Sequence, residues 1–383
     1  MAGPLAGIRV VEIGGIGPSP FGAMMLADMG AEVIRVERVT AVGGGGNPAF
    51  NVTNRGRRSI AIDLTKPEGQ EALLKLVEKA DALTEGFRPG VMEKLGVGPE
   101  ACLARNPRLV YARMTGWGQE GPYAKAAGHD INYISLAGAL AHYGVEGGQP
   151  VPPLNMVGDN GGGGMFMAFG VVCGLLEAKA SGKGQVIDCA MVDGAAVLMS
   201  PFHGMAAAGG FSEVRGTNML DTGAPYYNSY ECADGKYISI GPLEPQFYAE
   251  LLQRLGLEND PDFLAREDRA RWPGLKRRLT EIFKSKTQAQ WCEVLETTDV
   301  CFAPILPMSE AAVHPHNVQR KTFIEVAGVR QPAPAPRFSR TATDLPTPSA
   351  APGADTTAIL MEWAGMDSSE IERLTSAGVF AQG

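Results

Sequence analysis

The sequence lacks an excess of positive charge. Its 383 residues include 34 lysines and arginines against 42 aspartates and glutamates, a formal net charge of -8. Proteins that bind nucleic acid or an anionic membrane surface usually carry basic patches and a basic balance. We therefore expect neither partner.

Long hydrophobic runs are also missing. No stretch approaches about 18 uninterrupted apolar residues, and no basic N-terminal segment precedes an apolar run, so we expect neither a membrane span nor a secretion signal. The C-terminal AQG does not match a peroxisomal address. We expect a cytoplasmic, soluble protein that is long enough for two domains.

Cysteine is sparse, with six residues and no C-x-x-C pair. These cysteines stand in apolar contexts, which is typical of buried, reduced thiols. His314 and His316 flank a proline, but no nearby cysteine, aspartate or glutamate in the sequence completes a ligand set. We therefore expect no metal site.

Strand and helix patterns alternate over the first half of the chain. The apolar segment 8–13, the glycine turn GGIGPSP, a helix over about 21–30 that Gly30 ends, and a strand over 31–37 form one parallel βαβ unit. The same alternation continues to about residue 190. It predicts an α/β fold, with a Rossmann-like, doubly wound parallel sheet in a large domain over 1–190.

The pattern changes after residue 190. Residues 191–225 are rich in glycine and methionine and are expected to form a linker. A hairpin and amphipathic helices over 226–318 predict a small α+β domain, followed by a return linker over 319–329. Residues 330–383 begin with a proline-rich extended segment, and their last helices are expected to complete the large domain.

The first glycine turn invites comparison with the dinucleotide fingerprint, because Glu37 ends the second strand where a ribose-binding acid would lie. The turn reads Gly15-x-Gly17-x-x-Pro20, so the third glycine is missing, and prolines remove backbone donors that a phosphate would need. A noncatalytic or NAD-binding module remains an alternative hypothesis that this turn disfavours.

Asp159 stands just before four glycines and a long apolar helix, in NMVGDNGGGGMFMAFG. It could be an N-cap, with the glycines allowing close packing against a neighbour. Glycine lowers helix stability by about 1 kcal/mol relative to alanine, so we expect a close backbone approach at this helix to offset that cost. Free N–H groups at such a helix start could instead hold an oxyanion, with Asp159 as acid/base or nucleophile.

His129 and Glu244 are two further candidates. His129 lies between Gly128 and Asp130 in a connection beyond a predicted strand, where open α/β sheets bind ligands. Alternatively, the imidazole could only form a hydrogen bond with a neighbouring residue and have no function. Glu244 immediately precedes Pro245 and could be a first-turn glutamate that the helix dipole favours.

Several motifs together resemble the class III (formyl-CoA transferase-like) CoA-transferase family over nearly the whole chain. They are PLAGIRVVEIGGIGPSP, MMLADMGAEVIRVE, NRGRRSIAIDL, EGFRPGVMEKLG, MTGWGQEGPYA and SGKGQVIDCAMVDG. Within the family the chain is most similar to the alpha-methylacyl-CoA racemase branch, because AGHDINYISL carries His129 where the transferases usually have an aromatic residue. The resemblance implies the family's fold and an interlocked homodimer.

The resemblance also implies a catalytic set of His129 and Asp159 with Glu244, the last from the other subunit. These residues suit interconversion of (R)- and (S)-2-methylacyl-CoA, an isomerase reaction of fatty acid and lipid metabolism, in which one group acts on each face of the α-carbon. Glu244 would orient the imidazole of His129. The enolate oxygen would be held by the N–H of Asp159 and the glycine-rich helix start. The resemblance implies no metal or redox cofactor, since side chains carry the protons, and CoA is part of the substrate rather than a cofactor.

Basic and apolar side chains are expected to bind CoA. The resemblance assigns phosphate contacts to Arg38, Arg88 and Lys94, and adenine or pantetheine contacts to Ile16 and Ile62, whereas composition alone would read the cations as solvated surface charge. Arg55, Arg57 and Arg58 form a further basic cluster. Flexible methionines could accept acyl groups of different shape, or could simply fill the core; they are Met191, Met199, Met205 and Met219.

The main alternative is a CoA-transferase. In that reaction Asp159 attacks the thioester, a mixed anhydride forms, and CoA moves to a second carboxylic acid. His129 is the residue that argues against it.

Overall fold

The computed structural model describes residues 2–44 and 46–383. The chain forms two compact units. Unit 1 comprises Met1–Ala137, Leu154–Leu198 and Lys321–Gly383, and unit 2 comprises Gly138–Pro153 and Met199–Arg320.

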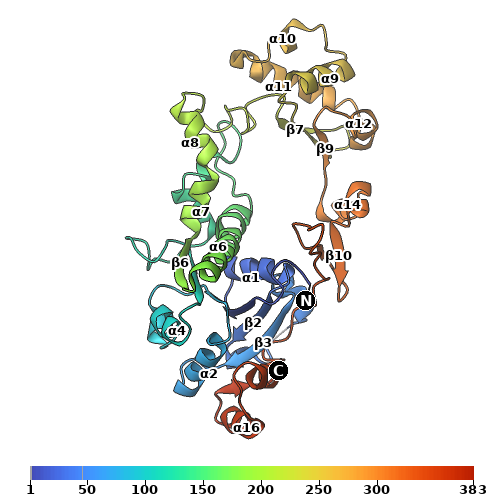
Figure 1. Cartoon of the computed structure of the whole chain (residues 1–383). Coiled ribbons are helices and arrows are strands. Elements are labelled where there is room, and N and C mark those ends of the chain that lie inside the picture. The colour runs from blue at the N-terminus through green and yellow to red at the C-terminus, as the bar shows by residue number, and fades with distance from the viewer. Residues whose placement is uncertain (1, 45) are drawn as a thin grey trace. The chain divides into compact units, whose positions relative to one another are not determined.

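Unit 1 is built on a seven-stranded sheet in the order β12-β3-β2-β1-β4-β5-β6. Six strands are parallel and β12 pairs antiparallel with β3 (Figure 1). The strands are β1 (Arg9–Ile13), β2 (Glu32–Glu37), β3 (Arg57–Ile62), β4 (Ala82–Glu85), β5 (Val110–Thr115), β6 (Gln185–Ala190) and β12 (Phe380–Ala381). This is the doubly wound order that the alternating pattern predicts.

Helices cover both faces of the sheet. Successive residues of each strand point to opposite faces, and apolar residues on both faces need a helix layer to bury them. Val11 packs in a core with residues of α2, α15 and α16, whereas its neighbour Val10 packs in a second core with residues of α1 and α6. Figure 1 shows α1 and α6 on one side of the sheet and α2 and α16 on the other. The helices of unit 1 are α1 (Pro18–Asp28), α2 (Pro67–Val77), α3 (Val91–Lys94), α4 (Pro99–Arg105), α5 (Asp130–Leu136), α6 (Phe166–Ser181), α7 (Met191–Leu198), α15 (Thr356–Glu362) and α16 (Ser368–Ser376).

The glycine run forms a π-helix, η5 (Met156–Met165), that continues directly into α6. By length and composition alone, the combined helix Met156–Ser181 could cross a membrane. A core helix of a soluble protein meets the same criterion, and here Met167, Ala168 and Val171 are buried in the core of unit 1. The helix is therefore weak evidence for a membrane span.

Unit 2 has a three-stranded antiparallel sheet in the order β7-β8-β9, packed against helices around its own core. Its strands are β7 (Asn228–Glu231), β8 (Tyr237–Ile240) and β9 (Phe302–Ile305). Its helices are α8 (Ser200–Ala207), α9 (Pro245–Leu255), α10 (Pro261–Leu264), α11 (Trp272–Phe283), α12 (Gln288–Leu295), α13 (Met308–Ala311) and α14 (Pro315–Arg320).

The units differ from the predicted domain limits in two places. Residues 138–153 cluster with unit 2 rather than with the large domain, and most of the predicted linker, from Met199 on, also belongs to unit 2. Arg215 explains part of this, since its guanidinium donates to the carbonyl oxygens of Ala141 and Gly148. The return segment adds the hairpin β10 (Phe323–Val326) and β11 (Val329–Pro332) to unit 1.

Candidate active site

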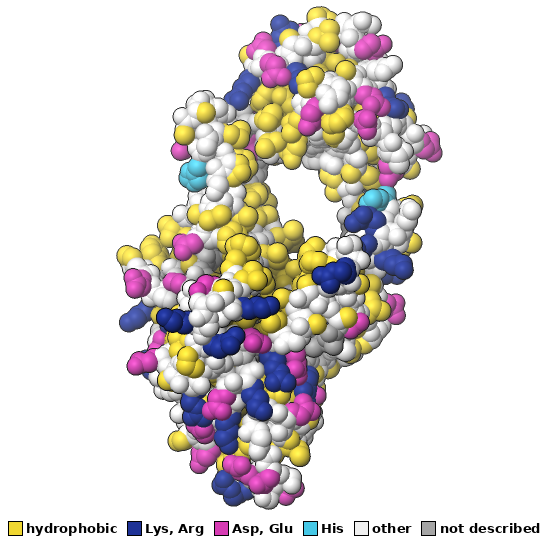
Figure 2. Space-filling model, in the orientation of Figure 1, with side chains coloured by type: hydrophobic (Ala, Val, Ile, Leu, Met, Phe, Trp, Pro, Cys, Tyr) yellow, Lys and Arg dark blue, Asp and Glu magenta, His cyan; other side chains and the backbone are white. Residues whose placement is uncertain are grey.

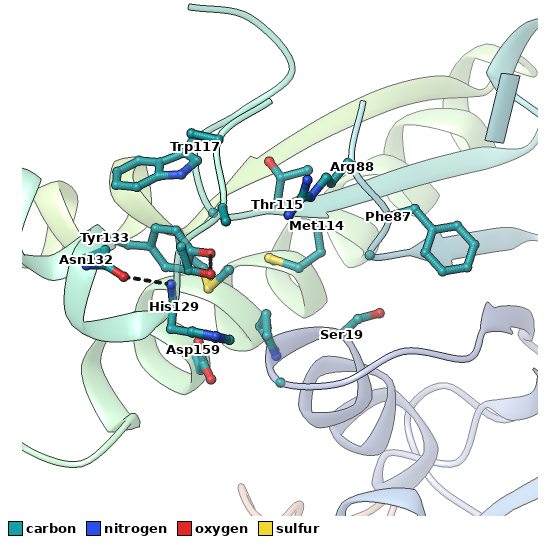
Figure 3. Close-up of a pocket in the computed structure, with 18 of the residues that line it drawn as sticks. Ser19, Phe87, Arg88, Met114, Thr115, Trp117, His129, Asn132, Tyr133 and Asp159 are labelled. Carbon is teal, nitrogen blue, oxygen red and sulfur yellow. Dashed lines mark hydrogen bonds between the residues drawn. The ribbon is translucent and has the colours of Figure 1, made fainter. Parts of the chain in front are cut away.

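A cavity of about 530 Å³ opens at the carboxyl ends of β1, β4 and β5. Its wall consists of the β1–α1 turn, the β4–α3 loop, the end of β5, the start of α5, Asp159 and Met191 (Figure 3). In the sheet β1 lies between β2 and β4, so the strand order reverses there. Doubly wound proteins bind their ligands at this kind of reversal.

His129 is the residue that precedes α5, and its backbone is extended. Its peptide N–H donates to the side-chain oxygen of Asn132 at 3.0 Å. The residue before it is also fixed, because the Tyr133 hydroxyl donates to the Gly128 carbonyl and the Tyr133 ring packs edge-on against Trp117. These contacts hold the backbone in place while the exposed imidazole lines the cavity.

Asp159 lies inside the first turn of η5, and the N-cap of that helix is Asn155. The N-cap interpretation of Asp159 is therefore wrong: the helix begins before the glycine run. The amide of Asn155 donates to Asp159 Oδ2 at 3.1 Å. A Cβ atom built on Gly17 would lie 3.4 Å from the same oxygen, so the carboxylate is close to the β1–α1 turn.

The side chains of His129 and Asp159 face the same cavity (Figure 3). Burial raises the pKa of Asp159 above the usual range of an aspartate, and the charge of Asp130 adds to the increase. The hydrogen bond from Asn155 and a positive charge on His129 oppose it. A carboxyl group with a raised pKa is better matched to proton transfer near neutral pH than an ordinary aspartate is.

Asp130 is a site residue that sequence reasoning did not single out. It is 7% exposed, and its Oδ1 accepts the backbone N–H of Asp159 at 2.7 Å. The predicted oxyanion contact at this N–H stays a prediction, and it requires the substrate oxygen to replace or share the acceptor Asp130 Oδ1. The only sequence signal was the position of Asp130 directly after His129, in the first turn of a helix.

The four glycines permit close packing on two sides of η5. A Cβ atom on Gly164 would lie 2.6 Å from the Pro18 carbonyl oxygen in α1, and one on Gly162 would lie 2.6 Å from the Ala195 nitrogen in α7. Both distances are far below ordinary carbon contacts. The close approach that the sequence predicted is confirmed, and it fixes the turn that carries Asp159.

The predicted CoA contacts divide into three groups. Arg88 and Ile16 line the cavity, and the Ile16 side chain is 85% exposed. Arg38 and Lys94 are exposed but do not belong to the cavity wall. Ile62 is 2% exposed and lies in the core of unit 1, so a side-chain contact with adenine or pantetheine is excluded in this conformation.

The predicted basic cluster around Arg57 is mostly structural. Arg55 pairs with Asp28 at 2.6 Å, and Arg57 pairs with Glu12 in the interior. Arg58, which is partly exposed, pairs with Glu362 at 2.6 Å. These arginines already have carboxylate partners, so the cluster is not a free phosphate site.

Glu37 also has a partner. Its carboxylate pairs with Arg35 Nε at 2.5 Å, and the same guanidinium donates to the Gly15 carbonyl at 3.1 Å. The acid that would bind a ribose in a dinucleotide fold instead helps to hold the β1–α1 turn. This contact adds to the case against a dinucleotide site.

Glu244 belongs to unit 2, where it precedes α9 as the N-cap residue rather than a first-turn residue. Its side chain is exposed and makes no capping hydrogen bond. A purely structural role in starting the helix is therefore not supported.

The four predicted methionines also lie in different surroundings. Met191 lines the cavity in unit 1, whereas Met199 and Met205 line a separate cavity of about 210 Å³ in unit 2. Met219 packs against the core of unit 2.

No group of three or more histidine, cysteine, aspartate or glutamate side chains with the geometry of a metal site occurs within residues 2–44 and 46–383. His314 Nε2 lies 2.8 Å from Glu296 Oε1, so this imidazole is paired with one carboxylate.

The chain belongs to CoA-transferase family III, whose family model matches residues 5–356. It is 44% identical to the alpha-methylacyl-CoA racemase of Mus musculus over 97% of this chain and 96% of the relative. It is 42% identical to the alpha-methylacyl-CoA racemase of Homo sapiens over the same shares of the two chains. A solved CAIB/BAIF family protein from Brucella suis has a TM-score of 0.81 and 27% identity, and the match covers 95% of this chain and 100% of that one. The predicted family and fold are therefore confirmed.

Proposed function

We propose that the protein is a racemase or epimerase that interconverts (R)- and (S)-2-methylacyl-CoA thioesters. The observation that carries the proposal is that the His129 imidazole and the Asp159 carboxylate line one cavity at the strand-order reversal. The sequence similarity to two alpha-methylacyl-CoA racemases supports the same reaction.

In the proposed reaction the thioester acidifies the hydrogen on its α-carbon. One of the two groups removes that proton, and the electron pair moves into the carbonyl to form an enolate. The other group, on the opposite face, returns a proton to the α-carbon, so the configuration is inverted and no atom is gained or lost overall.

The residue types suit this exchange. Imidazole titrates near neutral pH, and the raised pKa of Asp159 brings its carboxyl group toward the same range. Each group can therefore act as acid in one direction and base in the other. No metal or redox cofactor enters this sequence of steps.

The enolate oxygen is proposed to accept a hydrogen bond from the N–H of Asp159, in place of Asp130 Oδ1. Arg88, in the cavity wall, is assigned to the CoA part of the substrate, with Arg38 and Lys94 as further phosphate contacts.

The proposal includes an interlocked homodimer in which Glu244 of one subunit orients His129 of the other. Hydrophobic side chains gather at the surface over α6 and α7 (Figure 2), and Phe169, Leu176 and Val197 are more than half exposed in the single chain. Exposed apolar surface of this kind supports burial against a second copy. Six free cysteines within the described chain support a reducing compartment such as the cytoplasm.

A CoA-transferase is the second candidate, and family membership favours it. Asp159 would act as nucleophile on the thioester, and CoA would pass to a second carboxylate. A transferase has no need for an imidazole beside that carboxylate. His129 therefore favours the racemase.

Incubation of one pure 2-methylacyl-CoA epimer in heavy water tests the proposal. We expect deuterium at the α-carbon and formation of the opposite epimer. Mass spectrometry and NMR measure both products. A parallel incubation with a second free carboxylic acid tests for CoA transfer. Transfer without exchange at the α-carbon would overturn the racemase assignment in favour of the transferase.

A further inference from the structure

The segment that carries Glu244 is a short loop between β8 and α9 in unit 2. It starts at Gly241, whose N–H donates to the Cys301 carbonyl at 2.9 Å, and it ends at Glu244, where α9 begins. Pro242 and Pro245 lack N–H groups, which limits the hydrogen bonds that the loop can make by itself. Within the loop, the Leu243 N–H donates to the Gly241 carbonyl at 2.9 Å, and the carbonyls of Pro242 and Leu243 accept from outside the loop.

Arg266 supplies the donors for these two carbonyls. Its guanidinium donates to the Leu243 carbonyl at 3.0 Å and to the Pro242 carbonyl at 3.4 Å. These are the two carbonyl groups immediately before Glu244. The Arg266 side chain is only 14% exposed, so solvent competes weakly for the contacts.

The Arg266 guanidinium is itself held by the Glu267 carboxylate, whose Oε1 accepts from Nε at 3.0 Å, and by two aromatic rings. It lies 5.2 Å from the ring centroid of Tyr226 and 4.8 Å from that of Tyr248, and Tyr248 belongs to α9. The Arg266 carbonyl accepts the Trp272 indole N–H at 2.7 Å. Both the backbone and the planar side chain are thus fixed, and the guanidinium connects the loop to the helix that follows it.

We propose that Arg266 is a positioning residue that sets the place of the Glu244 carboxylate through the two carbonyls before it. A planar guanidinium can stack on tyrosine rings and donate along its edge at the same time, whereas a lysine ammonium cannot do both. The inference rests on the role proposed for Glu244 in orienting His129. It adds that this role depends on a residue that acts through the backbone of the loop.

The test compares Arg266→Met and Arg266→Lys with Arg278→Met in the full-length protein. Arg278 is a matched control, because it also lies in unit 2 over an aromatic ring, 4.7 Å from the Phe263 centroid, and also pairs with carboxylates, those of Asp260 and Asp262. Unlike Arg266, it directs its hydrogen bonds to these carboxylates and not to the carbonyls before Glu244. Two measurements are made: hydrogen exchange of the amides of residues 241–248, and the pH profile of kcat for epimerisation. Glu244→Gln, alone and combined with Arg266→Met, completes the set.

We expect faster amide exchange over 241–248 in both Arg266 variants, with little change there in Arg278→Met. Displacement of a positioned group by about 1 Å can cost up to about a hundredfold in rate, so kcat should fall about tenfold to a hundredfold. The pH profile should shift in the direction seen for Glu244→Gln, and Arg266→Met should add little in the Glu244→Gln background.

The possible failures are distinguishable. Unchanged exchange over 241–248 in Arg266→Met overturns the inference, whatever Glu244 does. A loss of thermal stability with a native pH profile also overturns it, since that pattern describes a merely structural arginine. If Glu244→Gln epimerises normally, the role proposed for Glu244 fails first, and the positioning role of Arg266 in catalysis fails with it.

Discussion

His129 and Asp159 meet in one cavity, yet they are held there in opposite ways. His129 is exposed, and its backbone is held by Asn132 and by the contacts of Tyr133 with Gly128 and Trp117, all within the segment from Trp117 to Tyr133. Asp159 is half-buried, and it depends on Asn155, on packing of η5 against two helices, and on Asp130, which is 29 residues away. One group is positioned by its neighbours in sequence and the other by the tertiary fold.

The difference affects the acidity of the two groups as well as the contacts that hold them. Burial is the largest cause of the raised pKa of Asp159, so its ability to hold a proton depends on the packing around it. The His129 imidazole is exposed and does not depend on burial in this way. Two side chains of very different intrinsic acidity can thereby exchange roles.

The largest effect is expected from removing either group. His129→Ala and Asp159→Asn should each lower proton removal from one epimer by about 100-fold to 10,000-fold, because each group serves one face of the α-carbon. Single-turnover exchange of each pure epimer in heavy water measures this. His203→Ala is the control, since His203 is an exposed histidine of α8.

The two variants should show opposite preferences, one slow with the (R) epimer and the other slow with the (S) epimer. Equal residual exchange from both epimers in both variants would contradict the assignment of one group to each face.

The His129 side of this comparison was predictable from sequence. The strand over β5, the following turn and the histidine before a short helix are all local patterns, and the structure has them where they were expected. The glycine run also predicted a close approach. Its partners in α1 and α7 could not be predicted, because they come from segments far away in the chain.

The surroundings of Asp159 were harder to predict from the sequence. The sequence suggested an N-cap, whereas the helix starts before Asp159 and follows a π-helical path through the glycines. Hydrophobic periodicity does not distinguish such a path from an α-helix. The sequence also does not show which arginines are buried, so the cluster of Arg55, Arg57 and Arg58 did not reveal that Arg57 pairs with Glu12 in the interior.

A second prediction tests the packing that supports Asp159. Gly164→Ala would bring a Cβ atom within 2.6 Å of the Pro18 carbonyl oxygen and 3.0 Å of the Gly22 nitrogen, and backbone atoms cannot move aside easily. Overpacking of this kind typically costs about 1 to 3 kcal/mol of unfolding free energy. Urea unfolding followed by circular dichroism measures the loss.

Gly170→Ala is the matched control on the same helix. Its Cβ atom would lie 3.4 Å from Ile187, an ordinary contact, so alanine should be neutral or stabilising by up to about 1 kcal/mol. If Gly164→Ala is as stable as Gly170→Ala, close packing against α1 does not explain the glycine at position 164.

The smallest effect is expected at Asp130, where charge and hydrogen bonding can be separated. The negative charge of Asp130 raises the pKa of Asp159, so Asp130→Asn should lower that pKa while the asparagine oxygen still accepts the Asp159 N–H. In the direction where Asp159 removes the proton, it must be ionised. The acid limb of kcat should therefore move to lower pH, with a maximal rate within about tenfold of the unmodified protein.

Asp130→Ala removes both the charge and the acceptor, so it should show the same shift in the acid limb together with a larger fall in the maximal rate. The buried N–H of Asp159 would then lack a partner, which typically costs about 1 to 3 kcal/mol and allows the turn to move. Rate profiles of both variants between acidic and neutral pH separate the two contributions. If the acid limb moves to higher pH, the charge of Asp130 does not raise the pKa of Asp159. If alanine and asparagine behave identically, the hydrogen bond from the Asp159 N–H to Asp130 does not help to hold Asp159 in place.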